Sequence, residues 1–291
     1  MKTPKKEYFY KLGQSIIPPI ILDILKKSRV YPAFKKTLNL FVGYEYRPQW
    51  NRVNGGSLAG RELFFDPQGP WQEMLSGEYD QPMFDYTSKL DLAGKTIFDV
   101  GMHIGFHSLN FAHYVGKEGR VVSFEPNRFN VERFKMILTH NQDLAERITV
   151  CETAVSNGIG VEKFIFSDNI EAGTSSGSFI DSADTFFSKE TYQAYGFQET
   201  EIKTLKLDSL EIETGITSKP ALIKIDVEGA ECFVLEGAED LLLRCRPIIL
   251  LEVHSILNMF KVTTQLSRLN YSLLILDQNK DGRCFLAAEP Q

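Results

Sequence analysis

The stretch from Lys95 to Ser108, KTIFDVGMHIGFHS, constrains the fold of this chain more than any other. A short β-type run over residues 96–100 leads into a turn that contains Gly101 and Gly105, and a helical pattern follows. Glycine lets a ligand come close to the backbone, and the first turn of a helix has N–H groups without intrahelical partners. The stretch therefore predicts a strand, a turn and a helix that together form a ligand site, although an ordinary capped turn has the same pattern.

Strand and helix patterns alternate from residue 95 onward. The expected strands cover residues 96–100, 119–124, 148–152, 161–167, 200–207, 221–227 and 247–253, with a final hairpin of 271–276 and 283–287. The expected helices cover residues 105–114, 129–139, 231–243 and 256–269. This alternation predicts an α/β fold with a largely parallel sheet, whose ligands bind beyond the carboxyl ends of the strands. Residues 168–196 read as a long loop, and loops of that length are usually functional.

The part of the chain before residue 95 divides into two pieces. A strand pattern at 61–65 and helical patterns at 70–79 and 84–90 predict a cap in front of the core domain. With 291 residues, of which 43% are hydrophobic, the chain is large enough to bury a sizeable core. The expected regions are a basic helical segment at 1–50, a helical and β cap at 51–94, and a ligand-binding domain at 95–291.

Charge and cysteine content restrict the compartment and the partners. Residues 1–36 carry nine Lys or Arg against two acids, whereas the whole chain has a net charge of −6. This basic segment either lies on an anionic membrane surface or packs, with its lysines in water, on the domain or on a second subunit of a homodimer. The acidic remainder disfavours nucleic acid as a partner. Four scattered cysteines, with no signal peptide and no span-length apolar run, predict a cytoplasmic protein, at most peripheral on the inner face of the membrane.

Acidic residues follow the central strands of the predicted sheet. In strand order they are Asp99, Glu125, Glu152, Asp226 with Glu228, and Glu252, which is followed by His254. Because the carboxyl ends of parallel strands meet at one edge of a sheet, we expect these side chains to lie near one another. An acid at the end of the second strand is suited to accept hydrogen bonds from both hydroxyls of a ribose.

The glycine turn argues against a dinucleotide. Dinucleotide folds use G-x-G-x-x-G, in which helix N–H groups bind the pyrophosphate, whereas this chain has D-x-G-x-x-x-G from Asp99 to Gly105. A carboxylate at that point repels a phosphate and suits a cationic amino acid end. A ligand that carries ribose, adenine and an ammonium group, but no phosphate, is S-adenosylmethionine.

Several motifs together resemble the FkbM-type methyltransferase family. They are DVGMHIGFHS at 99–108, FEPN at 124–127, LDSL at 207–210, IKIDVEGAE at 223–231, VLEGA at 234–238, and the segment 247–254. The resemblance covers about residues 55–256. It implies a class I methyltransferase (Rossmann-like) fold with helices on both faces of a seven-stranded, mostly parallel sheet in the order 3-2-1-4-5-7-6. Family members methylate mostly hydroxyl groups, on sugars and on polyketide-type products. This chain departs from the family at Met102-His103, where Ala-Asn is more usual.

The resemblance implies a role for each strand end. Asp99, Gly101 and Gly105 would line the methionine part of the cofactor, Glu125 would hold the ribose diol, and residues 152–154 would flank the adenine. The full set expected at the cofactor is Asp99, Gly101, His103, Gly105, Glu125, Pro126, Asn127, Glu152, Thr153, Ala154 and Asp226.

Methyl transfer to an alcohol requires alignment of donor and acceptor, and it is helped by a base that draws away the hydroxyl proton. The candidate catalytic residues are His254, Asp226, Glu228 and Glu252. His254 has an intrinsic pKa suited to a base near neutrality, or else it hydrogen-bonds Glu252 or the backbone. Oxygen ligands for Mg²⁺ are present among these acids, but no spacing demands an ion and none is expected.

We therefore expect an S-adenosylmethionine-dependent O-methyltransferase that acts on a sugar hydroxyl in a glycan or glycolipid precursor. One alternative acceptor is the hydroxyl of a small polyketide-type metabolite. Two other classes stay open on the sequence alone: a nucleotide-dependent oxidoreductase of the same sheet class, and a binding module that kept the fold without catalysis.

Overall fold

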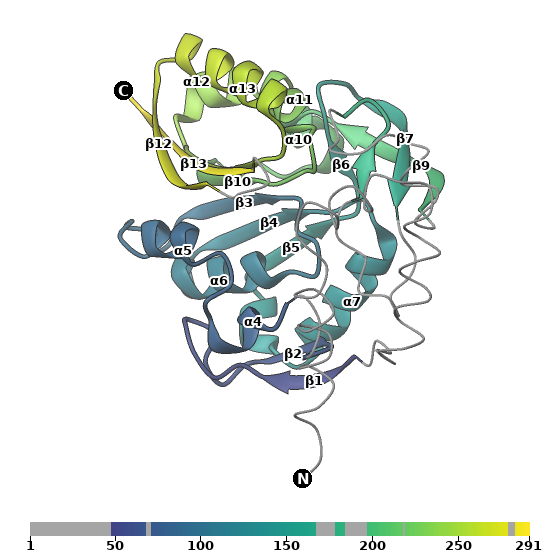
Figure 1. Cartoon of the computed structure of the whole chain (residues 1–291), viewed down its shortest axis with the longest axis vertical. Helices are drawn as coiled ribbons and strands as arrows, with labels where there is room; N and C mark the ends of the chain where they lie inside the picture. The colour runs from purple at the N-terminus through teal and green to yellow at the C-terminus, as the bar shows by residue number, and fades with distance from the viewer. Residues whose placement is uncertain (1–47, 68–70, 167–177, 184–196, 218, 279–282) are drawn as a thin grey trace, which may run out of the picture. The chain divides into compact units, whose positions relative to one another are not determined.

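The computed structural model describes residues 48–67, 71–166, 178–183, 197–217, 219–278 and 283–291 (Figure 1). Apart from Phe197, these residues belong to one compact unit, Arg47–Phe186 with Gln198–Gln291. The basic segment at 1–36 and most of the loop expected at 168–196 lie outside the described residues. The expected region boundaries near residues 50 and 94 stay predictions.

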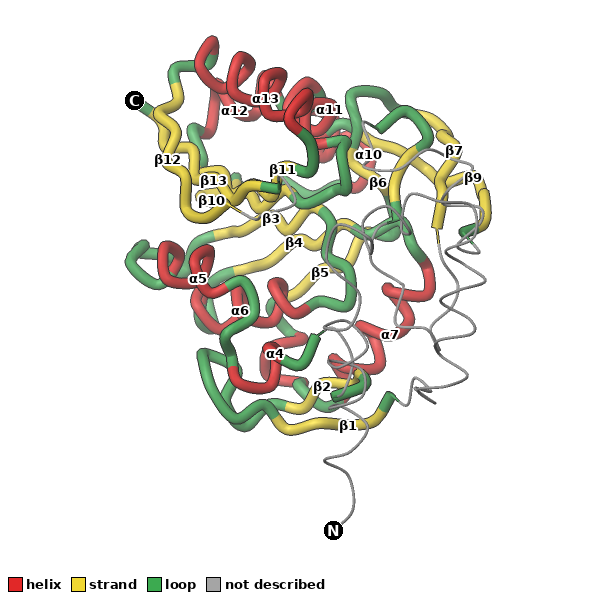
Figure 2. The backbone as a smooth tube through the Cα atoms, viewed as in Figure 1, coloured by secondary structure: helices red, strands yellow, loops and turns green. Residues whose placement is uncertain are grey.

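A seven-stranded sheet forms the centre of the fold (Figure 2). Its strands are β3 (Thr96–Val100), β4 (Arg120–Phe124), β5 (Ile148–Cys151), β10 (Pro220–Ile225), β11 (Ile248–Val253), β12 (Tyr271–Gln278) and β13 (Cys284–Pro290). The order across the sheet is β12-β13-β11-β10-β3-β4-β5. β13 runs antiparallel to both of its neighbours, and the other pairs are parallel. Numbered along the chain from the β5 edge, this is the order 3-2-1-4-5-7-6, so the predicted class I methyltransferase sheet is confirmed.

The innermost strands are apolar on both faces. β3, β10 and β11 read TIFDV, PALIKI and IILLEV, and almost all of their side chains are buried. Parallel strands that helices cover on both sides have such continuous apolar runs. Phe98, Ile223 and Leu251, one from each strand, belong to a single apolar core cluster. Asp99 and Lys224 are charged exceptions in β3 and β10, and both are buried.

Helices cover both faces of the sheet, as expected. On one side lie α5 (Gln81–Thr87), α6 (Phe106–Val115) and α7 (Arg128–Thr139), and on the other α11 (Glu231–Glu236), α12 (Glu239–Cys245) and α13 (Ile256–Arg268) (Figure 1). The short elements are α8 (Gln142–Ala145), the 3-10 turn η2 (Leu207–Ser209) and α10 (Leu210–Thr214). Asn127 and Ser255 cap α7 and α13, because each side chain accepts a hydrogen bond from a backbone N–H in the first turn. Among the described residues, no helix combines the length and the apolar character that crossing a bilayer requires.

A second sheet, which the sequence patterns do not predict as a separate unit, lies between β5 and β10 in the chain. Its order is β6-β9-β7-β8, with β6 (Ala154–Val155), β7 (Gly160–Phe166), β8 (Phe179–Ile180) and β9 (Gln198–Leu205). The patterns at 161–167 and 200–207 mark its two long strands correctly within the described residues. Their antiparallel pairing with each other carries no local signal, because periodicity identifies a strand and not its partner.

The helix predicted at 231–243 is two helices, separated at Gly237. A Cβ atom at residue 237 would lie 2.1 Å from the carbonyl oxygen of Ser156. The chain that leaves β6 therefore approaches the break so closely that only glycine fits there. Asp208 caps α12, because its carboxylate accepts hydrogen bonds from the backbone N–H groups of Asp240 and Leu241.

The region before β3 packs on the core domain. β1 (Gln49–Arg52) and β2 (Glu62–Phe65) pair antiparallel, which confirms the strand predicted at 61–65. Of the helix predicted at 70–79, only α4 (Glu73–Ser76) forms, and it ends at Gly77 with φ of 78°. The helix predicted at 84–90 begins earlier, as α5. Phe84 of α5 stacks on His107 of α6, with ring centroids 5.1 Å apart.

Replacing Gly237 by Ala should destabilise the fold by about 1–3 kcal/mol, because the added methyl group meets backbone that cannot move aside without shifting β6. The measurement is the free energy of unfolding in urea.

Gly158→Ala is the matched control, since a Cβ atom at Gly158 would meet nothing within 4 Å. Equal stabilities for the two variants would contradict the close approach at Gly237.

Candidate cofactor and acceptor site

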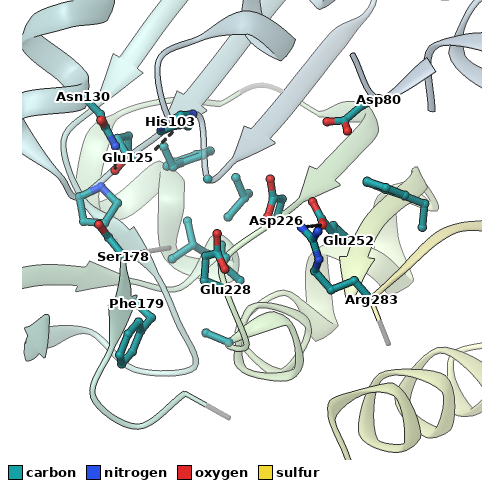
Figure 3. A pocket seen from close by; sticks show the side chains of 18 of the residues that line it. Asp80, His103, Glu125, Asn130, Ser178, Phe179, Asp226, Glu228, Glu252 and Arg283 are labelled. Atoms are coloured by element: carbon teal, nitrogen blue, oxygen red, sulfur yellow. Dashed lines mark hydrogen bonds and ion pairs between the residues drawn. The ribbon is translucent and has the colours of Figure 1, made fainter. Parts of the chain in front are cut away.

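A cavity of about 570 Å³ opens at the carboxyl ends of the central strands. Its size is typical of small-molecule sites, and its position is the one where open α/β sheets bind ligands. Figure 3 shows Glu125 and His103 at one end and Glu252 with Arg283 at the other, with Asp226 between them. The cap and the second sheet complete the wall with residues that include Trp71, Tyr79, Asp80, Phe164, Phe179 and Ile180.

The turn after β3 is held by two close approaches of backbone and side chains. A Cβ atom at Gly101, where φ is 81°, would lie 1.8 Å from the carbonyl oxygen of Asp226. A Cβ atom at Gly105, where φ is 85°, would lie 2.0 Å from the ring of Phe134. Gly101 lines the cavity, whereas Gly105 packs against α7 and does not. Both glycines are therefore required by the fold, and Gly101 also exposes bare backbone to a ligand.

His103 lies in this turn in a left-handed conformation, with φ of 53°. Its ring lines the cavity, 5.2 Å from the ring of Trp71 between centroids. Burial lowers the pKa of His103 to about 3, and the nearby Arg133 contributes to the shift. The imidazole is therefore neutral, so this side chain brings no positive charge to the site.

The carboxylate of Glu125, directly after β4, is held in place by several hydrogen bonds. Its Oε2 accepts a hydrogen bond from the backbone N–H of His103 at 2.8 Å. Its Oε1 accepts hydrogen bonds from the backbone N–H of Asn127 at 2.9 Å and from the amide of Asn130 at 3.3 Å. Burial raises the pKa of Glu125 to about 7, although these donors act in the opposite direction. The carboxylate is thus fixed in orientation between β3 and α7 and faces the cavity.

Asp99 lies behind the cavity wall rather than on it. It is completely buried, accepts a hydrogen bond from the hydroxyl of Ser108 at 2.5 Å, and is 3.2 Å from the ammonium of Lys224. Lys224 in turn donates to the carbonyl oxygen of Gly101 at 2.6 Å and lies 3.4 Å from Asp226. Burial alone would lower the pKa of Lys224, but the two carboxylates raise it. The ion pairs of Lys224 with Asp99 and Asp226 fix the glycine turn. They also hold Asp99 behind the cavity wall, away from anything in the cavity.

Only some of the residues expected around an adenine line the cavity. Thr153 and Ala154 line the cavity, as does Phe179 of β8. Glu152 is exposed and does not line it. Pro126 lines the cavity, whereas the buried Asn127 caps α7 instead, as its sequence position before a helix allows.

Four acidic side chains surround the imidazole of His254. Its Nδ1 lies 2.8 Å from Oε1 of the buried Glu231, and its Nε2 lies 3.4 Å from Glu228, 3.6 Å from Asp226 and 3.8 Å from Glu252. Burial alone would lower the pKa of His254, but the carboxylates of Glu228 and Glu231 raise it well above the ordinary value. His254 does not line the cavity. Because of this raised pKa, the imidazole of His254 is protonated as long as no other cation binds beside it. A protonated imidazole is unfavourable as a general base.

Glu252 and Arg283 form an ion pair at the end of the cavity away from Glu125 and His103. The Arg283 guanidinium donates to Oε1 of Glu252 at 2.9 Å, and both side chains line the cavity (Figure 3). Burial raises the pKa of Glu252 to about 8, with a further contribution from Asp226. Arg283 directly precedes β13, which pairs with β11 in the sheet, so the sheet order itself brings this pair together.

The structure thus brings together most of the expected site residues. On the cavity wall lie Gly101, His103, Glu125, Pro126, Thr153, Ala154, Asp226, Glu228 and Glu252. Asp99, Gly105, Asn127, Glu152 and His254 lie outside it. The sequence analysis missed Glu231, although it lies in the IDVEGAE motif, and it missed Arg283 and Phe179, for which no local pattern exists.

The sheet order, the glycine turn after the first central strand and the acid after the second define the class I S-adenosylmethionine-dependent methyltransferase fold. Residues 99–273 match the family described as Methyltransferase FkbM domain, and the chain therefore belongs to the FkbM methyltransferase family. The match is to a methyltransferase domain, which sets aside the oxidoreductase alternative.

Comparison with known proteins gives a distant sugar-modifying relative. The hexuronic acid methyltransferase AglP of Haloferax volcanii is 29% identical over 185 residues, which cover 64% of this chain and 66% of that protein. The match therefore spans just under two thirds of that relative. Similar solved structures include a methyltransferase FkbM from Methylobacillus flagellatus, with 18% identity, a TM-score of 0.49, and coverage of 69% of this chain and 45% of that chain. A second is a putative rRNA-methylase from Clostridium thermocellum, with 12% identity, a TM-score of 0.46, and coverage of 73% and 94%.

The raised pKa of Glu125 has a consequence for stability. Folding favours the protonated carboxyl of Glu125. The contribution of this group to the free energy of unfolding is therefore fully present below the ordinary pKa of 4.5 and is lost as the pH rises through about 7. Glu125→Gln removes this dependence. We expect the unfolding free energy of the variant, relative to the wild type, to rise by up to about 3 kcal/mol between pH 5 and pH 8.

Urea unfolding of both proteins across this pH range measures the effect. Glu152→Gln, at an exposed strand end outside the cavity, reports what the removal of a surface charge does. A difference between wild type and Glu125→Gln that stays constant with pH would contradict the shift.

Proposed function

We propose that this methyltransferase transfers the methyl group of S-adenosylmethionine to a hydroxyl group of a sugar, in a glycan or glycolipid precursor. The observation that carries the cofactor assignment is the fixed carboxylate of Glu125. Its Oε2 has one donor and keeps a lone pair for a ribose hydroxyl. The long bond from Asn130 to Oε1 is the one that a second ribose hydroxyl would replace.

The remaining cofactor contacts follow from the position of the ribose. Thr153 and Ala154 would flank the adenine, with Phe179 of β8 as an apolar surface beside it. The bare backbone of Gly101 and the neutral His103 would lie along the methionine part. Asp99 would act through Lys224, by holding the turn, and not by touching the cofactor.

The acceptor end of the cavity is rich in carboxylates. Asp226, Glu228 and Glu252 line it, and a sugar hydroxyl placed there would donate to one of them. The hydroxyl proton would pass to that carboxylate while the oxygen attacks the methyl carbon and the carbon–sulfur bond breaks. We assign this role to the cavity-facing carboxylates in preference to His254, because His254 is turned toward them from behind the wall. The sugar class is supported by the relative that modifies a hexuronic acid.

Glu125→Ala should weaken the binding of S-adenosylhomocysteine roughly 10- to 100-fold, because it removes charge-assisted hydrogen bonds to the ribose. Isothermal titration calorimetry measures the affinity.

The matched control is Glu152→Ala, in which an exposed acid next to the cavity is removed. Unchanged affinity in Glu125→Ala would contradict the assignment of Glu125 to the ribose, and absence of binding in the wild type would overturn the proposed cofactor site.

A panel of neutral sugars, uronic acids and lipid-linked saccharides, incubated with the full chain and S-adenosylmethionine, should contain an acceptor. Mass spectrometry should show that acceptor gaining the mass of one methylene group. Methylation of polyketide-type alcohols alone would overturn the sugar assignment while leaving the methyltransferase activity in place.

A further inference from the structure

Three ligand-type atoms at the acceptor end of the cavity surround one point. A carboxylate oxygen of Asp226, a carboxylate oxygen of Glu228 and a ring nitrogen of His254 all lie within 4.8 Å of one another. Nε2 of His254 is 3.6 Å from Oδ1 of Asp226 and 3.4 Å from Oε2 of Glu228. Atoms bound at about 2.1 Å to one ion are about 3.0 Å apart when adjacent and about 4.2 Å apart when opposite. Small shifts of these three side chains would therefore be enough for the three atoms to bind one ion.

The buried histidine is oriented from behind, which is an independent observation. Glu231 is fully buried, and its Oε1 lies 2.8 Å from Nδ1 of His254 and accepts the backbone N–H of Gly229 at 3.0 Å. The amide of Asn258 donates to its other oxygen. A carboxylate that accepts a hydrogen bond from Nδ1–H fixes the tautomer in which Nε2 presents its lone pair to a metal. Nε2 points toward the carboxylates of Asp226 and Glu228, the other two members of the cluster.

The two acids are also positioned for this role. Asp226 uses its Oδ2 toward Lys224, at 3.4 Å, and turns its Oδ1 toward His254. Glu228 has a left-handed backbone, with φ of 54°, which ends the strand direction of β10 and turns the chain at the cavity. Glu252, which the sequence alone groups with these acids, is held by Arg283 instead. The ligand set is therefore two carboxylates and one imidazole.

We propose that Asp226, Glu228 and His254 bind one divalent cation of the first transition row, with its remaining coordination positions open to the cavity. Carboxylates with one imidazole suit Mn²⁺ or its neighbours, and three protein ligands leave positions for exchangeable water.

The role of the ion rests on the proposed methyl transfer. A sugar hydroxyl that replaces a bound water becomes more acidic, because the ion stabilises the alkoxide. The hydroxyl proton would pass to the carboxylate of Glu252, which lines the cavity and is not one of the three ligands. The oxygen would form a bond to the methyl carbon, and the carbon–sulfur bond would break with its electron pair left on sulfur. The ion changes neither charge nor oxidation state.

Titration of the full chain with Mn²⁺, followed by the electron paramagnetic resonance signal of the free ion, tests the site directly. We expect one saturable site per chain. Glu228→Gln and His254→Gln should each weaken it at least about 10-fold, because each removes one of three ligands. Glu118→Gln, which changes an exposed acid that does not line the cavity, is the control and should bind as the wild type does.

Calorimetry with S-adenosylhomocysteine in the presence of EDTA separates this inference from the proposed function. If the cofactor product binds while Mn²⁺ does not saturate, or if both ligand variants bind Mn²⁺ as the wild type does, the metal site is overturned and the methyltransferase assignment stands. If Mn²⁺ binds and the ligand variants lose it, the site is supported, whatever the result with the cofactor product. Circular dichroism of each variant confirms that a loss of binding is not a loss of folding.

Discussion

The ammonium of Lys224, buried between Asp99 and Asp226, is the interaction on which the site depends. It joins β10 to β3 through Asp99, pairs with Asp226 just beyond the end of its own strand, and donates to the carbonyl oxygen of Gly101. A buried charge is tolerated only when it is paired, and removal of one partner of such a group typically costs about 3–5 kcal/mol. The position of the glycine turn, and through it the backbone donor to Glu125, is therefore set by electrostatics inside the sheet as well as by hydrophobic packing.

The fold could be predicted from the sequence where the pattern is local. The continuous apolar runs of β3, β10 and β11 mark buried parallel strands, and their order follows from the family resemblance. The break at Gly237 could not be predicted, because its cause is a contact with Ser156, far away in the chain. The second sheet was missed for a similar reason: its strands are visible in the sequence, but their mutual pairing depends on chain geometry.

The site residues were likewise predictable only where the signal in the sequence is local. Glu125 was predicted, because its place after the second strand has a chemical meaning, and the structure puts it on the cavity wall. The position of Asp99 differs, because its charge is used by Lys224 inside the sheet. The intrinsic pKa of His254 suggested a general base, but the carboxylates around the ring raise its pKa and keep it protonated. Arg283 is brought to Glu252 by the reversed strand β13, which no spacing in the sequence reveals.

The contact between Gly101 and the carbonyl oxygen of Asp226 has a consequence for how enzymes of this shape diversify. It ties the turn proposed to bind the cofactor to the strand end proposed to face the acceptor, so neither can be remodelled without disturbing the other. New acceptor preferences must therefore arise elsewhere, in the cap and in the small sheet. Both contribute wall residues, such as Tyr79 and Phe179, from outside the seven-stranded sheet, where insertions and substitutions leave the donor chemistry intact.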